Sequence, residues 1–478
     1  MSIQGSETEG PDSQYRRFAS PEEELSLNIL RTRGPVRILM ILGCTRRAAT
    51  RLAYDQGHAL SNSLKTAQRP TSPEVPFEDA WRFIIEVGRA AHRYGSTATR
   101  LESFLVGLSK RLGYEAVVRS APSDIVLGLR ESPDLPQRVE VLATPPPDID
   151  LHKLARVGDL LNEVETGTVS LAEASARLDA IERMPPPWGW VASMLGYAMV
   201  GLGLAALLGG GWTDTLFASL FSMLVYGMVV LSGRIGTAAV DWLPFSTTFV
   251  VGVLATVVKT RVPELNLVLV ILSAVAVLLP GYTISLGAGE LVAQRVVSGM
   301  ANLMSGLVCL VKQIAGGWLG VVVAGSAVSV AAGGPAAAID PTWMWLLIPL
   351  LVIGLCLVFQ TSHRDLPWAA LVCCIAYLGI MAGSSILDSN VGNLVGTIIA
   401  VVVANLWARY TGRPTSIVLL PAIVMLVSGS IGFRGLAAMA EGELVVGAQQ
   451  FSQMFVVALT IVTGIMIGYT IVRPEPTL

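Results

Sequence analysis

Two polar stretches interrupt long apolar runs in the second half of the 478-residue chain. The first contains Pro280, Gly281, Thr283, Ser285 and Glu290. Because Pro and Gly break a helix, the freed amides and carbonyls can bind the carboxylate and the ammonium of a small zwitterion. The alternative is an ordinary kink in which the Ser and Thr hydroxyls bond to their own helix, with Glu290 and Arg295 forming a solvated pair.

The second stretch has similar chemistry and contains Ser428, Gly429, Arg434 and Glu443. The guanidinium of Arg434 can pair with a substrate carboxylate. Glu290 or Glu443 can take an ammonium group or carry a proton. The hydroxyls of both stretches can bond to a hydroxyl on the substrate side chain, which would disfavour valine.

Lys312 is the third candidate, because it lies in the middle of an apolar run between Leu310 and Ile314. An ionisable group inside a bilayer is costly and marks a functional site unless it reaches water. We therefore predict that Lys312 lines a translocation pathway. The alternative is that the span is shifted and the ammonium extends to an interface.

Nearer the N-terminus, Gly95, Arg100 and Glu102 belong to a polar cluster between two helical patterns. Residues two apart on a helix do not face each other, so Arg100 and Glu102 need different partners. The alternative is a capped helix start with solvated charges.

Several classes of protein are disfavoured by what the sequence lacks. It contains no GxxxxGK[ST], HExxH, paired CxxC or GxSxG string, so an ATP-driven pump or a hydrolase of a common type is not indicated. Four of the five cysteines lie in apolar runs, where a thiol packs as a small hydrophobe. With a net charge of −2, nucleic acid is not an expected partner. We expect no enzyme activity, no cofactor and no metal.

The distribution of charged residues divides the chain into a charge-rich N-terminal part and a charge-poor remainder. Of 68 charged residues, 48 lie in the first 187 positions and 20 in the remaining 291. Uncharged runs of this length span a bilayer as helices, so we predict a membrane all-α fold of about ten transmembrane helices behind a small soluble α+β domain. The predicted spans are 190–210, 216–233, 242–258, 265–285, 302–323, 343–360, 366–384, 391–408, 415–431 and 450–472.

Four segments follow from this reading: a disordered leader at 1–72, a soluble cytoplasmic domain at 73–187, and two membrane halves at 188–330 and 331–478. In the soluble domain, periodicity predicts two amphipathic helices from residue 77, strands at 114–119, 124–129 and 138–143, and helices at 151–165 and 170–183. Ser170 is expected to cap the last helix, with Glu173 at the capping-box distance.

Orientation and symmetry are also suggested by the sequence. Six of nine Lys and Arg residues in the predicted loops lie on the side that makes both termini cytoplasmic. The string VLLP occurs at 277–280 and 418–421, and GELV at 289–292 and 442–445. Two five-span halves would face opposite ways, as in transporters with inverted repeats.

The chain resembles the threonine/serine exporter family in several separated segments. They are GRAAHRYGSTATRLESFLVGLSKRLGY, WGWVASMLGYAMVGLGLAALLGGGW, LLPGYTISLGAGELVAQRVVSGMANL and GSIGFRGLAAMAEGELVVG. The resemblance implies ten spans in two halves, a cytoplasmic N-terminal domain, and export of L-threonine and L-serine driven by the proton motive force. One departure is Ser428-Gly429, where the family tends to carry Pro-Gly.

We therefore predict a multi-pass protein of the cell membrane that exports small amino acids, with the amino acid, protons and the bilayer as partners. The alternative is a membrane-anchored hydrolase or sensor whose activity lies in the N-terminal domain. Ten spans exceed what an anchor needs, and polar groups inside them favour a translocation pathway. The sequence leaves the oligomeric state open.

Overall fold

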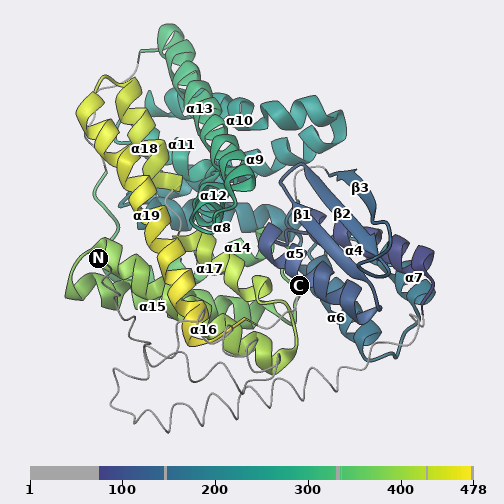
Figure 1. Ribbon diagram of the computed structural model, residues 1–478. Coiled ribbons are helices and arrows are strands. Elements are labelled where there is room, and N and C mark those ends of the chain that lie inside the picture. Colours follow the sequence, from purple (N-terminus) through teal and green to yellow (C-terminus); the bar gives the residue numbers. More distant parts are fainter. Residues whose placement is uncertain (1–74, 145–147, 330–333, 335, 427–428, 475–478) are drawn as a thin grey trace, which may run out of the picture. The chain divides into compact units, whose positions relative to one another are not determined.

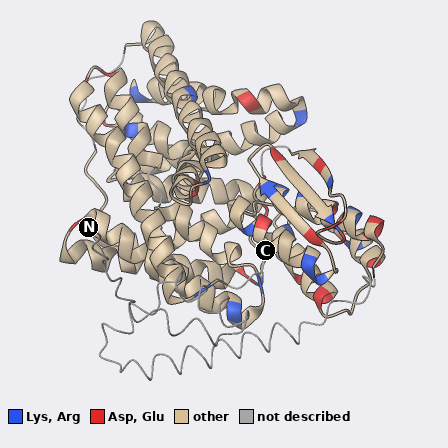
Figure 2. Ribbon diagram, in the orientation of Figure 1, with Lys and Arg blue, Asp and Glu red and all other residues tan. Residues whose placement is uncertain are grey.

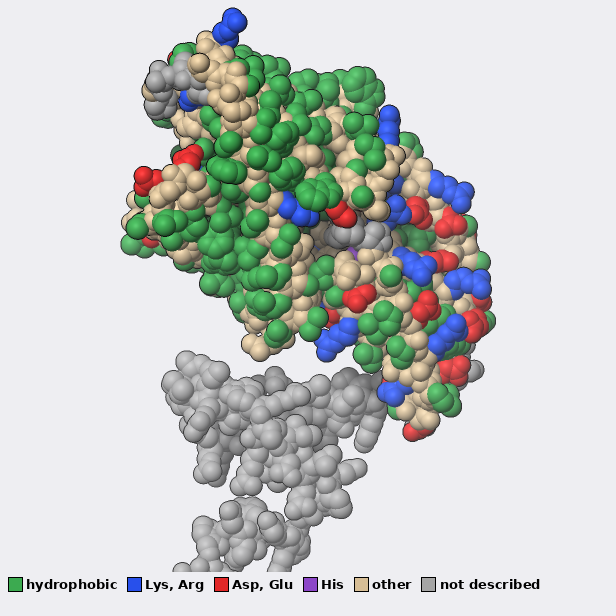
Figure 3. Space-filling view, turned by 90° about the horizontal axis from the view of Figure 1, so that it is seen from above, with side chains coloured by type: hydrophobic (Ala, Val, Ile, Leu, Met, Phe, Trp, Pro, Cys, Tyr) green, Lys and Arg blue, Asp and Glu red, His purple; other side chains and the backbone are tan. Residues whose placement is uncertain are grey.

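The computed structural model describes residues 75–144, 148–329, 334, 336–426 and 429–474. The leader predicted at 1–72 lies outside these residues. The described part is mostly helical, with one small sheet near its N-terminal end (Figure 1). Charged residues are concentrated around that sheet and its helices, whereas the later helices carry few (Figure 2). The space-filling view shows a broad hydrophobic surface over these later helices (Figure 3).

The N-terminal domain combines four helices with a three-stranded antiparallel sheet of order β1-β2-β3. Its elements are α4 (Phe77–Arg93), α5 (Ala98–Arg111), β1 (Glu115–Ser120), β2 (Asp124–Arg130), β3 (Arg138–Ala143), α6 (Leu151–Glu165) and α7 (Leu171–Glu182). The predicted helices and strands of this domain are confirmed. Its core is formed by apolar side chains at helical and alternating spacing, among them Phe83, Leu101, Leu105 and Leu127.

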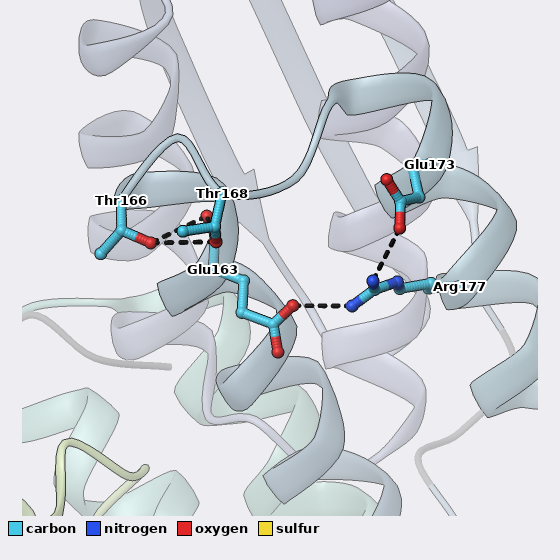
Figure 4. Close-up of polar contacts among 5 residues, drawn as sticks. All are labelled: Glu163, Thr166, Thr168, Glu173 and Arg177. Carbon is cyan, nitrogen blue, oxygen red and sulfur yellow. Dashed lines mark hydrogen bonds and ion pairs between the residues drawn. The ribbon is translucent and has the colours of Figure 1, made fainter.

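Helices α6 and α7 form a hairpin that local polar contacts hold in place. Ser170 caps α7 as predicted, its Oγ accepting a hydrogen bond from the Glu173 amide at 3.3 Å. Arg177 donates to Glu163 of α6 at 2.7 Å and to Glu173 at 2.6 Å (Figure 4). These groups are solvated, and exposed pairs of this kind contribute at most about 1 kcal/mol each.

The rest of the chain supplies the predicted membrane helices. By length and composition alone, nine helices among the described residues could cross a bilayer, or ten if one bent pair counts as a single span. They are built from α8 (Trp190–Leu207), α9 (Trp212–Ile235), α10 (Thr237–Lys259), α11 (Leu267–Ala274), η2 (Ala276–Leu278), α12 (Gly281–Val292), α13 (Val296–Ala327), η3 (Pro341–Trp343), α14 (Met344–Val358), α15 (Leu366–Ile386), α16 (Ser389–Thr411), α17 (Ser416–Leu426), α18 (Gly429–Ala440) and α19 (Leu444–Ile471).

The bent pair is the predicted fourth span, and it is broken as expected. Helix α11 ends at Ala274, a short 3-10 turn follows, and α12 begins at Gly281 after a bend of 65°. Pro280 stands at the break, where its ring cannot continue the helix. The span extends to Val292 rather than to residue 285, so Glu290 lies inside it and not in a loop.

Small residues allow the long helices to approach closely, which is how helices associate where both solvent and core are apolar. A side chain at Gly316 or Gly320 of α13 would overlap backbone atoms of α10. Gly464 and Gly468 of α19 lie 148 residues further along, and side chains there would overlap Thr397 and Val401 of α16. Each predicted half thus has a pair of glycines, four residues apart, where two helices approach closely.

The repeated sequence strings do not follow this spacing. The first VLLP lies at the break before α12, whereas the second lies inside α17, where Pro421 is an interior residue. The two VLLP strings therefore do not occupy equivalent positions in the structure. The inverted repeat itself stays a prediction.

The N-terminal domain is bonded to loops that join the membrane helices. The backbone amides of Leu151 and His152 donate to carbonyls of the α14–α15 loop, each at 3.0 Å. Arg413, between α16 and α17, pairs with Asp159 of α6 at 3.0 Å and with Asp365 at 2.6 Å. Burial and then the nearby charge of Arg156 lower the pKa of the His152 ring, while its backbone amide makes this contact.

Candidate functional site

Helix α12 begins against Gly429, the first described residue of α18. A Cβ atom placed on Gly429 would lie 3.1 Å from Gly281 Cα and 3.2 Å from Gly281 N, so a larger residue would force its neighbours to shift. The N-terminus of α12 presents backbone amides without helical partners and the positive end of a helix dipole. The structure thus brings together the start of the first predicted stretch and the start of the second.

Two buried polar side chains lie next to this junction. Gln313 of α13 is fully buried, and its Nε2 donates to the Leu278 carbonyl at the break, at 2.9 Å. Within the described structure, its Oε1 has no hydrogen-bond partner, and neither has Oγ of Ser285, which is 5% exposed. Buried polar atoms left without partners are costly, so they indicate a place where a ligand can bond. Pro280 is buried and Thr283 half-buried at the same end of α12.

Arg434 lies on α18, five residues after Gly429, which is about 8 Å along a helix. Its side chain is half-buried, and Nε has no hydrogen-bond partner in the described part of the chain. Ser428, the residue before Gly429, lies outside the described residues.

Glu290 lies at the other end of α12, about 14 Å from Gly281. Its Oε2 accepts hydrogen bonds from Ser298 Oγ at 2.7 Å and Asn302 Nδ2 at 2.8 Å, and the residue is 3% exposed. Its Oε1 is buried without a partner among the described residues. The alternative of a solvated pair with Arg295 is therefore wrong.

Two predicted residues are placed away from the junction. Glu443 is exposed at the start of α19, on the far side of α18. Lys312 is partly exposed and donates to the Asp241 backbone carbonyl of α10 at 3.0 Å. Its neighbour Gln313 faces the break instead. Whether Lys312 lines a pathway stays a prediction.

The polar motif of the N-terminal domain points into the membrane helices. Glu102 pairs with Arg295, between α12 and α13, at 2.6 Å, and also accepts from the Ser120 amide at 2.9 Å. Arg100 donates to Ser416 Oγ at 3.1 Å and to Tyr469 Oη at 3.2 Å. The alternative of solvated charges is wrong for Glu102.

Gly95 has a structural role in the same motif. It has a φ of 97° in the turn before α5, a conformation that L side chains rarely adopt, and it packs against Ile149. A tight turn here fixes the direction in which α5 starts. The start of α5 in turn sets where Arg100 and Glu102 point.

Sequence reasoning missed several members of this arrangement. They are Gln313, Ser298, Asn302, Ser416 and Tyr469. Gln313 offers one usable signal, because it is a polar residue beside Lys312 in an apolar run. The others are ordinary residue types whose partners come from distant segments, so no local pattern marks them.

The groups around the start of α12 combine positive charge with hydrogen-bond acceptors. The α12 N-terminus and a guanidinium offer positive charge, while carbonyl, amide and carboxylate oxygens offer acceptors. No group of three His, Cys, Asp or Glu side chains able to hold a metal ion occurs among the described residues.

Comparison with known proteins identifies two matching family models that together cover most of the chain. One, described as a threonine/serine exporter, matches residues 82–324. The other, described as "Threonine/Serine exporter, ThrE", matches residues 345–471. The first match ends within α13 and the second begins in α14, close to the predicted boundary between the membrane halves.

Individual relatives are distant. A threonine/serine exporter from Corynebacterium glutamicum is 23% identical over 342 residues, covering 68% of this chain and 68% of that protein. Pheromone-regulated membrane protein 10 from Yarrowia lipolytica is 23% identical over 384 residues, covering 77% of this chain. The match spans only 31% of that yeast protein's length. No solved structure matches the chain.

Proposed function

The chain belongs to the threonine/serine exporter family, and from this premise we propose that it exports L-threonine and L-serine, driven by the proton motive force. The observation that carries this proposal is the broken span formed by α11 and α12, whose second helix begins at Gly281 in contact with Gly429 of α18. Broken helices inside a helix bundle are the usual substrate sites of secondary transporters.

The junction suits each group of the substrate. The free amides at the start of α12, with Arg434, bind the carboxylate. The unpartnered Oε1 of Gln313 accepts from the ammonium. Ser285 bonds to the side-chain hydroxyl that threonine and serine share, so valine would leave it unpaired and bind less well.

Transport requires the junction to open to each side in turn. We propose that the two halves are inverted repeats that rock about it, with Gly316 and Gly320 in one half corresponding to Gly464 and Gly468 in the other. The buried carboxylate of Glu290 is the proposed proton carrier, because its Oε1 has no hydrogen-bond partner in the described structure.

The test is efflux of threonine from cells loaded with a threonine dipeptide, with unlabelled serine and valine as competitors. Ser285→Ala should reduce the preference for threonine over valine, and Arg434→Gln should reduce efflux itself. Arg177→Gln, a solvated arginine of the N-terminal domain, serves as the control (Figure 4). If Ser285→Ala and Arg434→Gln both leave efflux and selectivity unchanged, the substrate site is elsewhere.

The same experiment separates the exporter from its rival. If cells with and without the protein release threonine equally, the spans act as an anchor and the activity belongs to the N-terminal domain. We place that domain in the cytoplasm. A cysteine at Asp134, in its exposed β2–β3 turn, should therefore react with an impermeant reagent only after the cells are opened; labelling of intact cells would reverse the orientation.

A further inference from the structure

The N-terminal domain is bonded mainly to the second membrane half, residues 331–478. Asp159 of α6 pairs with Arg413 of the α16–α17 loop at 3.0 Å. One turn of chain away, a Cβ atom placed on Gly158 would lie 2.8 Å from the ring of Pro414 in the same loop. The start of α6 is also bonded through its backbone to the α14–α15 loop. These contacts make the domain an extension of the second half.

Helix α5 is bonded to both halves within its first two turns. Arg100 donates to Ser416 Oγ and Tyr469 Oη, which belong to the second half. Glu102 pairs instead with Arg295 of the first half, at 2.6 Å. Among the described residues, this pair is the one bond that joins the domain to the first half, apart from the covalent chain.

Both ends of this ion pair are held in place. The second carboxylate oxygen of Glu102 accepts from the Ser120 amide of β1 at 2.9 Å, which orients the side chain. The backbone amide of Arg295 donates to the Glu290 carbonyl at 2.8 Å and so closes the turn between α12 and α13. Both paired side chains are largely buried, so salt screens them less than it screens a surface pair. The pair therefore fixes the α12–α13 turn against the domain.

The α12–α13 hairpin has a counterpart 148 residues further along, in α18 and α19. A Cβ atom on Gly287 would lie 2.8 Å from the carbonyl oxygen of Gly299. At the corresponding positions, a Cβ atom on Gly435 would lie 2.9 Å from that of Gly447. Glu443, in the α18–α19 turn, is exposed and takes part in no ion pair among the described residues. If the halves are inverted, the two turns lie at opposite openings of the pathway, and the domain is bonded to the cytoplasmic one.

We propose that the ion pair between Glu102 and Arg295 is a latch that keeps the cytoplasmic opening of the pathway closed, while the N-terminal domain moves with the second half. This inference rests on the proposed function, because a latch matters only if the two halves rock against each other. When they rock, the latch opens and the α12–α13 turn moves away from the domain. The amino acid then enters from the cytoplasm.

The latch is the contact that such a motion breaks at the lowest cost. Separating the domain from the second half would break the Asp159 ion pair, the bonds of Arg100 and the backbone bonds of α6 together. Separating it from the first half breaks the latch alone among these bonds. The remaining contact there is apolar, because Tyr282 of α12 packs against the domain core and can slide.

Two cross-links test the latch in the full-length protein with its five native cysteines replaced. Gly158→Cys with Pro414→Cys joins the domain to the second half, and the two Cβ atoms are close enough for a disulfide once the proline ring is removed. Glu102→Cys with Arg295→Cys joins the domain to the first half. Two long side chains are lost there, so a reagent with two thiosulfonate groups on a short spacer replaces them. A reductant opens both links.

The two cross-links should have opposite effects on threonine efflux. The disulfide to the second half should leave efflux within about twofold of the reduced protein, whereas the link across the latch should lower it about tenfold or more, with recovery on reduction. Efflux that is unchanged by the link across the latch overturns the inference. A block by the disulfide overturns it as well, because the domain would then not move with the second half.

A second measurement needs no cross-link. Ser285→Cys in the same background places a thiol beside the start of α12. In inside-out vesicles, an impermeant thiol reagent should label it about threefold faster or more when Arg295→Gln is added, because the closed state loses its latch. Arg177→Gln, which breaks solvated pairs within the domain, should leave the rate unchanged. Equal labelling with and without Arg295→Gln means that the pair does not close the opening.

Failure of this inference and failure of the proposed function give different results. If the wild-type protein does not export threonine, the proposed function fails. If it does export threonine, and the link across the latch changes neither efflux nor its recovery on reduction, only the latch is wrong.

Discussion

Breaking the ion pair between Glu102 and Arg295 should loosen the N-terminal domain from the membrane helices without unfolding it. The Glu102 side chain is 10% exposed and that of Arg295 is 23% exposed. Exposed pairs contribute at most about 1 kcal/mol, and removing one partner of a buried pair costs about 3–5 kcal/mol. For Glu102→Gln we therefore expect the contact between the N-terminal domain and the membrane helices to be weakened by about 2–3 kcal/mol.

The second bond of Glu102 makes the prediction sharper. The carboxylate also accepts from the Ser120 amide, and a glutamine oxygen can keep that bond. Glu102→Ala removes both contacts and leaves a buried amide unpaired, which costs about 1–3 kcal/mol more. The alanine variant should therefore be the more damaging of the two.

Hydrogen exchange of the full-length protein in detergent provides the assay. A loss of about 2 kcal/mol raises the exchange rate of amides protected by this contact about 30-fold, and the rise should be confined to α5, β1 and the α12–α13 turn. Glu115→Gln breaks a solvated pair with Arg130 in the same sheet and should change the rate by less than about fivefold. The reasoning is refuted if Glu102→Gln and Arg295→Gln have additive effects in the double variant, since a direct pair must couple.

Three further outcomes follow from the geometry. Gly429→Ala should reduce export and lower the stability by about 1–3 kcal/mol, because its Cβ meets the backbone of Gly281. Gly227 has open space around it, so Gly227→Ala should change neither quantity in the same efflux and melting assays. Lys312→Met should lower export at normal expression; export at the wild-type rate would mean that the ammonium only reaches an interface. Burial lowers the pKa of His92, although the hydrogen bond to Ala121 and the charge of Asp124 both act to raise it. The unfolded state then takes up the proton first, so thermal stability should fall as pH drops below about 6.5, and less so in His92→Gln.

The sequence predicted those features that local pattern determines. Long apolar runs located the spans. The three strands could be located because a strand buried on one face has a residue pattern that repeats every second position. The break at Pro280 and Gly281 followed from their backbone restrictions. The span boundaries were less accurate. Charged residues were assumed to end a span, yet the buried Glu290 lies inside one and is stabilised by Ser298 and Asn302.

The partners in the candidate site could not be predicted, because they come from distant segments. The alternative interpretation paired Arg295 with its neighbour Glu290, whereas Arg295 pairs with Glu102, which lies 193 residues earlier in the chain. Local spacing limits which residues on one helix can meet, but it says nothing about a helix from another domain. The close approach of Gly281 and Gly429 is a tertiary contact of the same kind.

The direction of the domain's polar motif bears on which of the two competing functions is right. If the N-terminal domain were an enzyme carried on an anchor, the chemistry of its motif would face solvent or a cleft within the domain. Instead, Arg100 reaches Ser416 and Tyr469, and Glu102 reaches Arg295, so both side chains are directed at the membrane helices. The two residues lie two apart on one helix and make separate contacts. Glu102 holds the domain to the membrane helices through Arg295, whereas the positive charge of Arg100 has no acidic partner among the described residues. That division favours a domain that works as part of the transport pathway.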